Sequence, residues 1–207
     1  MSNEIQKASG VHPSVVQTAE RSLYIENRDG GTVNLNYNFP QTSVTGEMLM
    51  AVQSFSKDYY QLIVTGHDIF TSNSIVVTTD RALTEGNVPP ELLRTHSTLT
   101  DEAIERILLL PAVICNENTQ YYGKTDQQQK AIYAYVKKIK KCGKEIKIYF
   151  QPISFFAQQI LNECPIDFGI NTGSALTDLN KSRWYIKKVN LFEAFQDAHI
   201  DVPGPIQ

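Results

Sequence analysis

Few side chains in this sequence combine the types and the spacing that covalent catalysis requires. Cys115 ends an apolar stretch, and His67 or His96 would be the base that takes its proton. No cationic neighbour and no helix start lies beside Cys115 in the sequence to lower the pKa of its thiol. A cysteine in such a strand is more often a packed core residue, so we interpret Cys115 as part of the core.

Acid–base chemistry has equally little support. His67 precedes Asp68, which could orient an imidazole base, and Glu117 and Asp126 flank a polar loop as a candidate carboxylate pair. Such neighbours are common on any protein surface, and we interpret both groups as ordinary surface residues. The phosphate-loop, dinucleotide, HExxH and GxSxG motifs are absent. We therefore predict no catalytic residue, no metal site and no cofactor. The alternative is a small-ligand sensor or enzyme that uses His67, Cys115 or Glu117.

Length and composition limit the class of protein. The chain has 207 residues, of which 42% are hydrophobic and 20% charged, and a formal net charge of −3. These values are typical of a globular protein and give no global attraction to nucleic acid or anionic membranes. Cys115, Cys142 and Cys164 form no CxxC pair, so neither a disulfide framework nor a zinc site is indicated. Without a long apolar run or an N-terminal signal core, we expect a cytoplasmic protein that does not associate with membranes.

The most clearly patterned stretch is a bent β-hairpin over residues 131–153. Apolar and polar residues alternate along its first strand, and the alternation slips by one position at Lys137 and Lys138, which predicts a β-bulge. Gly143 suits the tight turn. One face of the return strand is apolar and consists of Ile146, Ile148 and Phe150. Bent hairpins of this kind turn the corners of small barrels, and the pattern resembles the opening strands of SH3-like or OB-like barrels.

Lysines crowd this hairpin, and only Glu145 opposes them locally. The candidate nucleic-acid contacts are Lys137, Lys138, Lys140, Lys141, Lys144 and Lys147. Beside the tyrosines at 133, 135 and 149, which could stack on bases, these lysines could contact phosphates. The alternative, which we favour, is a solvated hairpin tip whose lysines prevent edge-to-edge pairing with other sheets.

The polar stretch at 116–130 is the surface that we expect to bind a partner. A loop of this length inside a compact domain is often functional. Its candidate contact residues are Asn118, Tyr121, Tyr122, Lys124 and Asp126. Paired tyrosines beside polar side chains suit recognition of a protein or a ligand, and the alternative is a tyrosine pair packed on the barrel wall. In a small barrel this loop would join the first two strands at the mouth, where such folds often bind.

The order of the expected elements predicts an α+β fold. We expect a flexible N-terminus at 1–20, a β-rich part at 21–90, a small bent β-barrel decorated by helices at 91–202 and a tail at 203–207. Besides the lysine hairpin, strands are expected in a hairpin at 22–40 and at 59–65, 74–79, 112–115 and 184–189. Helices are expected at 45–55, 101–109, 154–162 and 190–199, several of them with a Thr, Ser or Asn that can cap the first turn.

Three sequence blocks resemble uncharacterised bacterial proteins with the same arrangement. The blocks are LPAVICNENTQYYGKTDQQQKA, KEIKIYFQPI and LNKSRWYIKKVNLFEAF, and the resemblance covers roughly residues 50–205. No activity is known for those proteins, so the resemblance implies no catalytic residue. It implies a bacterial accessory protein of the kind found in mobile or defence loci. We expect a non-enzymatic protein that presents a small-barrel surface to a protein partner or to a second copy, with nucleic-acid binding as the alternative.

Overall fold

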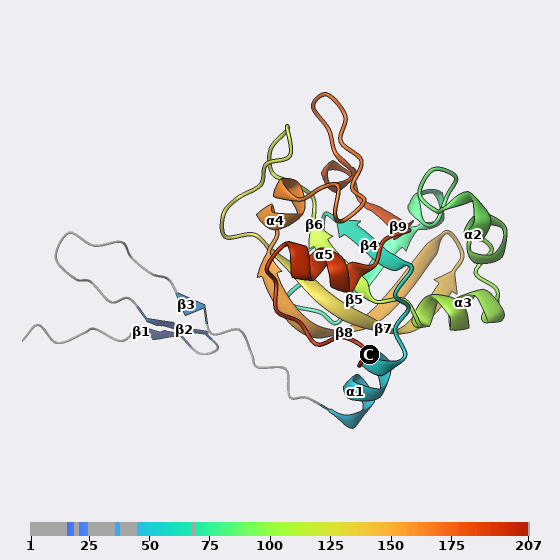
Figure 1. Cartoon of the computed structure of the whole chain (residues 1–207), viewed down its shortest axis with the longest axis horizontal. Coiled ribbons are helices and arrows are strands. Elements are labelled where there is room, and N and C mark those ends of the chain that lie inside the picture. The colour runs from blue at the N-terminus through green and yellow to red at the C-terminus, as the bar shows by residue number, and fades with distance from the viewer. Residues whose placement is uncertain (1–15, 19–20, 25–35, 38–44, 68, 207) are drawn as a thin grey trace, which may run out of the picture. The chain divides into compact units, whose positions relative to one another are not determined.

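The structure, a computed structural model, describes residues 16–18, 21–24, 36–37, 45–67 and 69–206 (Figure 1). Contacts divide the chain into two units, Met1–Gln41 and Thr42–Gln207. In the first unit, β1 (Val16–Thr18), β2 (Arg21–Tyr24) and β3 (Asn36–Tyr37) pair in that order as an antiparallel sheet. The turn expected between residues 27 and 31 lies outside the described residues.

The described part of the second unit is built on a six-stranded sheet with the order β5-β8-β7-β6-β4-β9. Its strands are β4 (Tyr60–Thr65), β5 (Ser74–Thr78), β6 (Ala112–Asn116), β7 (Lys130–Cys142), β8 (Glu145–Ala157) and β9 (Arg183–Lys187). β4 and β6 run parallel, whereas the other neighbours are antiparallel. Because β4 and β5 pair with strands that follow residue 90, the sheet extends across the boundary expected there.

Helices cover both faces of this sheet. They are α1 (Gly46–Gln53), α2 (Pro90–His96), α3 (Asp101–Leu108), α4 (Gln159–Glu163) and α5 (Leu191–Asp197), with short 3₁₀ helices η1 (Thr79–Arg81) and η2 (Asp178–Asn180). Buried residues of α1, α4 and α5 join the core on one face, and those of α3 join the core on the other, with α2 beside them. Thr45, Thr100 and Asn190 each accept a backbone hydrogen bond as N-caps of α1, α3 and α5. None of the helices in the described residues is long and apolar enough to cross a membrane.

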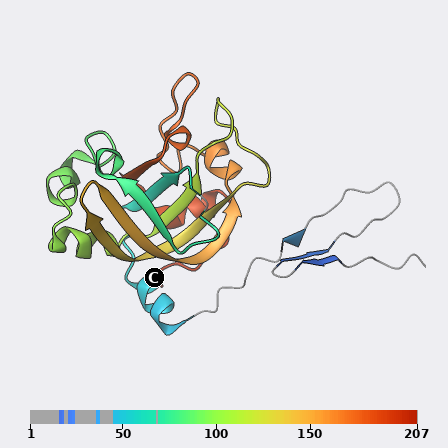
Figure 2. The ribbon, with the colours of Figure 1, turned by 180° about the vertical axis from the view of Figure 1, so that it is seen from behind.

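β7 and β8 form the long bent hairpin that the sequence predicts (Figure 2). Their register shifts between Val136 and Lys138, which confirms the expected bulge, and again between Tyr133 and Ala134. Gly143 has a φ of +62° in the turn. The bulges bend the strands, because the extra residues on one strand have no partner on the other.

The helix expected at 154–162 is wrong over its first half. β8 continues to Ala157, and only the second half of this segment forms α4. Phe155 lies opposite Ile132 and Phe156 opposite Ala131, so β7 supplies a complete ladder of backbone partners that far along β8. A neighbouring strand of this length outweighs the helical spacing of the apolar side chains.

The sheet curls into a half-barrel. Its two edge strands are β5 and β9, and the chain that leaves β5 runs on to β9. After β5 and η1, the segment at 82–87 lies along β9. Leu83 N donates to Trp184 O at 3.0 Å, and Ile186 N donates to Asn87 O at 2.9 Å. The fold is therefore α+β with a barrel-like sheet, as the sequence predicts at this level of detail.

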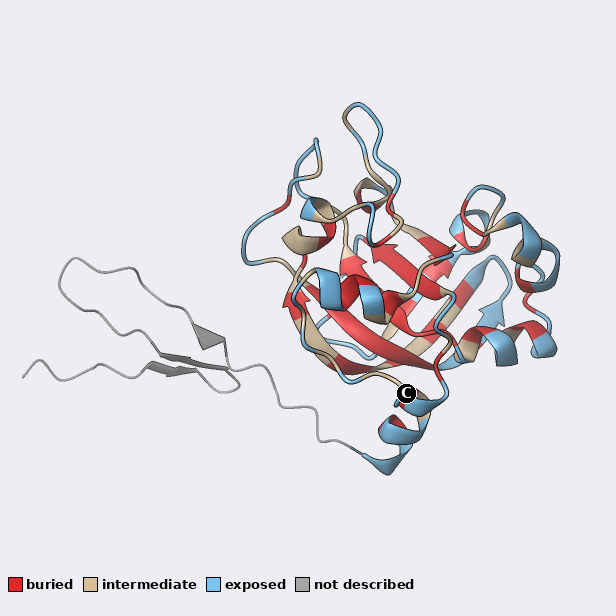
Figure 3. Ribbon diagram, in the orientation of Figure 1, coloured by how far each residue is buried: buried red, intermediate tan, exposed pale blue. Residues whose placement is uncertain are grey.

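The centre of the sheet is buried from both sides (Figure 3). All six residues of β4 are buried, and successive side chains of the strand enter opposite cores. The amide of Gln61, a buried polar residue of β4, donates to the carbonyls of Ile107 and Leu110 at 3.0 Å each and accepts from Trp184 Nε1 at 3.2 Å. Its hydrogen bonds tie the sheet to the end of α3, so its burial leaves no unpaired amide.

Candidate functional site

The polar loop at 116–130 is fixed to the fold by a network of side-chain amides. Gln158 lies just after β8, is completely buried, and donates from Nε2 to Asn116 O at 2.7 Å and to Asn118 Oδ1 at 3.2 Å. Its Oε1 accepts from Gln129 Nε2 at 3.0 Å, and the same nitrogen also donates to Glu117 O at 2.9 Å. The two ends of the loop are thus joined through one buried glutamine.

The middle of the loop is held by α4. Asn118 Nδ2 donates to Asn162 Oδ1 at 2.8 Å, and Asn162 Nδ2 returns a bond to Asn118 Oδ1 at 3.1 Å. Thr125 N donates to Gln159 Oε1 at 3.0 Å, and Thr125 Oγ1 donates to Gln129 Oε1 at 2.6 Å. Satisfied networks of this kind favour a single conformation, because every alternative leaves buried amides unpaired.

The other side of the loop is attached to the segment that contains η2. Asn118 N donates to Leu179 O at 2.7 Å, and Tyr122 N donates to Ala175 O at 2.8 Å. Asn180 Nδ2 adds a bond to Gln120 O at 2.9 Å. The loop and the segment at 171–177 rise on the same side of the sheet in both ribbon views (Figures 1 and 2). The long loop is therefore built into the fold along most of its length.

Although its backbone is anchored, much of the loop surface is exposed, and Tyr121 and Tyr122 belong to that exposed surface. Their side chains are 63% and 73% exposed. Tyr122 has a φ of +60°, which is an unfavourable backbone conformation for a residue with a Cβ, and Gly123 follows at +64°. Leu176, which follows the Ala175 that binds the Tyr122 backbone, is also exposed, at 40%. Anchored backbone thus presents two aromatic rings to solvent, and the expected alternative, a pair packed on the barrel wall, does not hold for these exposed rings.

The remaining candidate contacts in the loop differ in accessibility. Lys124 and Asp126 are exposed. Asn118 is half-buried, and its amide is committed to Asn162 and Gln158. Asn118 therefore positions the loop, whereas the tyrosines, Lys124 and Asp126 are available on the surface.

The side chains considered for covalent chemistry are spread through the fold. Cys115 is completely buried in β6, and burial raises the pKa of its thiol far above the usual range. His96 is buried in α2, where Nδ1 lies 2.8 Å from Thr95 Oγ1, and burial lowers its pKa. His67 is exposed, and its carbonyl accepts from Asn116 Nδ2 at 2.6 Å. In the part of the chain that the structure describes, no group of three or more His, Cys, Asp or Glu side chains could hold a metal ion.

Among the described residues, the carboxylate of Glu117 accepts hydrogen bonds from one residue, Ser182. Its Oε1 accepts from Ser182 N at 2.6 Å and from Ser182 Oγ at 2.5 Å. No hydrogen bond joins it to Asp126 among the described residues. The two carboxylates considered as an acid–base pair therefore have separate surroundings.

The lysines of the hairpin differ in their neighbours and in their exposure to solvent. Lys137 forms an ion pair with Glu47 of α1, with Nζ 3.1 Å from Oε1. Lys140 lies directly opposite Lys147 across the two strands, and Lys147 Nζ lies 5.2 Å from the centre of the Tyr149 ring. The lysines that are exposed to solvent are Lys137, Lys138, Lys140, Lys141 and Lys144.

No family model, curated protein or solved structure matches the chain. Sequence patterns identified the loop and its tyrosines but missed Gln158, because its segment has helical spacing. The polar pair Gln158–Gln159 amid apolar residues is the one signal in the sequence that could have indicated a buried amide network.

Proposed function

We propose that the protein is a non-enzymatic interaction protein that binds a protein partner through Tyr121 and Tyr122. The observation that carries this proposal is the exposure of both rings, at 63% and 73%, on a loop whose backbone is anchored on both sides. Exposed Lys124 and Asp126 lie close in sequence to the two rings and supply polar contacts at the rim.

The energetics of association favour such an arrangement. Tyrosines are enriched among the residues that contribute most to protein interfaces, because they bury a large area and lose little side-chain entropy. Ordering a loop on binding reduces affinity, and the amide network around Gln158 has already ordered this one. The strained conformation of Tyr122 supports the same interpretation, since strain that persists in a fold is concentrated at functional positions.

The proposal is tested by purification from the cells that naturally make the protein. The wild type is compared with the double variant Tyr121→Ala/Tyr122→Ala. A matched control is Leu49→Ala/Met50→Ala, which removes another adjacent pair of exposed apolar side chains, 49% and 77% exposed on α1. We expect a stoichiometric partner with the wild type and the control, and its loss with the tyrosine variant. Unchanged co-purification with the tyrosine variant would contradict the proposal.

A second candidate function, nucleic-acid binding by the lysine hairpin, is favoured by one observation. Lys140 and Lys147 lie directly opposite each other, which destabilises a hairpin unless an anion lies between them. Lys138 lies opposite Tyr149, so cations and a ring share this surface. Binding of a single-stranded oligonucleotide should then weaken steeply with salt and be lost in Lys138→Glu/Lys140→Glu/Lys144→Glu. No binding at low salt would end this candidate.

The finer description of the fold and the setting stays a prediction. A bulged hairpin with Ile146, Ile148 and Phe150 buried inside the curl supports the SH3-like or OB-like class. The role as a bacterial accessory protein in defence or mobile loci rests on the resemblance of the sequence blocks. Identification of the partner is the direct test of that setting.

A further inference from the structure

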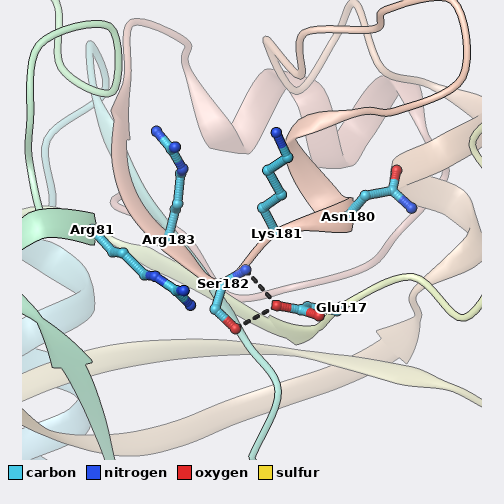
Figure 4. A pocket seen from close by; sticks show the side chains of 6 residues that line it. All are labelled: Arg81, Glu117, Asn180, Lys181, Ser182 and Arg183. Atoms are coloured by element: carbon cyan, nitrogen blue, oxygen red, sulfur yellow. Dashed lines mark hydrogen bonds between the residues drawn. The ribbon is translucent and has the colours of Figure 1, made fainter.

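A hollow with a volume of about 200 Å³ lies where the chain enters β9 (Figure 4). Its lining comes from η1, the end of η2, the start of β9 and the start of the polar loop. The residues that line it are Arg81, Glu117, Asn180, Lys181, Ser182 and Arg183. In Figure 4, the side chains of Lys181 and Arg183 extend in the same direction, and Arg81 reaches toward Ser182 from η1.

The charges that line the hollow do not balance. Arg81, Lys181 and Arg183 are three cations, and Glu117 is the one carboxylate among the lining residues, so the excess is two positive charges. Oε1 of Glu117 is already used by the backbone and hydroxyl of Ser182. Among the described residues, neither Arg81 nor Lys181 forms an ion pair, and Arg183 Nη1 donates only to the neutral amide of Asn87, at 3.3 Å.

One further carboxylate, Asp80, lies near the hollow without lining it. A hydrogen bond with Thr78 is the largest cause that lowers the pKa of Asp80, and the charges of Arg81 and Arg183 lower it further. Asp80 therefore offsets part of the positive charge from one side. The lining itself keeps the cationic excess, and the side chains of Lys181 and Arg183 extend in the same direction (Figure 4).

The size and chemistry of the hollow select an anion of one class. A phosphate monoester carries roughly −1.5 to −2 charges at neutral pH and accepts hydrogen bonds at three oxygens. Two guanidinium groups and an ammonium group match that charge, and guanidinium forks bind phosphate oxygens in pairs. The volume of about 200 Å³ lies below the roughly 300–1,000 Å³ of sites for drug-sized ligands. It suits a phosphate group with a small organic substituent.

We propose that this hollow binds the phosphate monoester of a small molecule, with Arg81, Lys181 and Arg183 as its anion contacts. This site is separate from the tyrosine surface, so it stands or falls independently of the proposed protein partner. Asn180 also lines the hollow, and its amide is held in place because Nδ2 donates to Gln120 O at 2.9 Å and Oδ1 accepts from Thr177 N at 2.8 Å and from Thr177 Oγ1 at 3.1 Å.

Isothermal titration of the full chain at constant ionic strength tests this site. The probes are inorganic phosphate, glycerol phosphate, glycerol, acetate and a phosphoserine peptide. We expect saturable binding of inorganic phosphate and of glycerol phosphate, and none of glycerol. In Arg81→Gln/Lys181→Gln the dissociation constant for glycerol phosphate should rise tenfold or more, since two charge-assisted contacts are lost.

The matched control is Lys57→Gln/Arg94→Gln, which removes the same charge from two exposed side chains outside the hollow and outside the lysine hairpin. It should bind as the wild type does. Equal weakening in the control, binding of acetate as tight as that of phosphate, or no saturable binding would overturn the proposal. Tighter binding of the phosphoserine peptide than of glycerol phosphate would overturn the small-molecule assignment. Melting curves for both variants verify that the loss does not come from unfolding.

Discussion

Gln129 Nε2 donates to Gln158 Oε1 at 3.0 Å, and this bond joins the end of the polar loop to the end of β8. The two residues are 29 positions apart in the chain. Gln158 is wholly buried, and all the hydrogen-bonding groups of its side chain are satisfied. The position of the exposed tyrosines thus depends on a residue that no partner can touch.

Replacement of Gln158 should destabilise the protein strongly. Gln158→Ala leaves the partly buried carbonyl of Asn116 and the amide of Gln129 without this partner, which we expect to lower the free energy of unfolding by about 3 kcal/mol. Denaturant unfolding measures the change. Gln127→Ala is the control, because Gln127 is exposed in the same loop. Equal, small changes in both variants would show that the network does not hold the loop.

The backbone at position 122 should prefer glycine. Tyr122 has a φ of +60°, and a Cβ makes this left-handed conformation unfavourable by about 1–2 kcal/mol. Tyr122→Gly should therefore be more stable than Tyr122→Ala by about 1 kcal/mol in thermal or denaturant unfolding. The reverse order of stability would mean that the loop does not hold this conformation in solution.

The buried ion pair Lys187–Asp178 should stabilise the fold more than the exposed pair Lys188–Glu91. Lys187 Nζ lies 2.5 Å from Asp178 Oδ2, and the two side chains are only 10% and 13% exposed. Asp178→Asn leaves the ammonium group buried without a counter-charge, which we expect to cost about 3 kcal/mol. Glu91→Gln removes the partner of Lys188 in a pair that is 67% and 43% exposed, and it should change unfolding little. Similar losses in the two variants would contradict this ranking.

His96 should make stability fall in mild acid. Burial, with a smaller contribution from the charge of Arg106, lowers its pKa in the folded state below 6.5. The unfolded state therefore binds more protons, and the free energy of unfolding decreases as the pH falls below about 6.5 and on toward the folded pKa. Unfolding at about pH 7.5 and about pH 5.5 should show a smaller decrease for His96→Gln than for the wild type. The same decrease in both would exclude His96 as the cause.

Local patterns were enough to predict the main hairpin and several helix starts. A period of two, a slip of one residue at Lys137 and a glycine at 143 are all contained in one short stretch. Thr100 and Asn190 likewise act within the turn that follows them. The end of β8 could not be predicted in this way, because its strand conformation depends on pairing with Ala131 and Ile132.

The candidate surfaces show the same limit. Tyr121 and Tyr122 were predicted as contact residues because aromatic pairs in a polar loop are visible in the sequence. The support of the tyrosines by Gln158, and the lining of one hollow by Arg81 and Lys181, depend on residues from distant parts of the chain. Such pairs depend on sheet order and on the path of the segment at 82–87, which no single stretch of sequence encodes.

The most direct test of the interaction surface is the affinity for the co-purified partner once it is identified. Dissociation constants are measured for the wild type, Tyr121→Ala/Tyr122→Ala and Leu49→Ala/Met50→Ala. If the two rings are the anchors, the tyrosine variant should lose about 2 kcal/mol or more, which is roughly a 30-fold rise in the dissociation constant. The α1 control should bind as the wild type does. An unchanged dissociation constant in the tyrosine variant would contradict the proposed function.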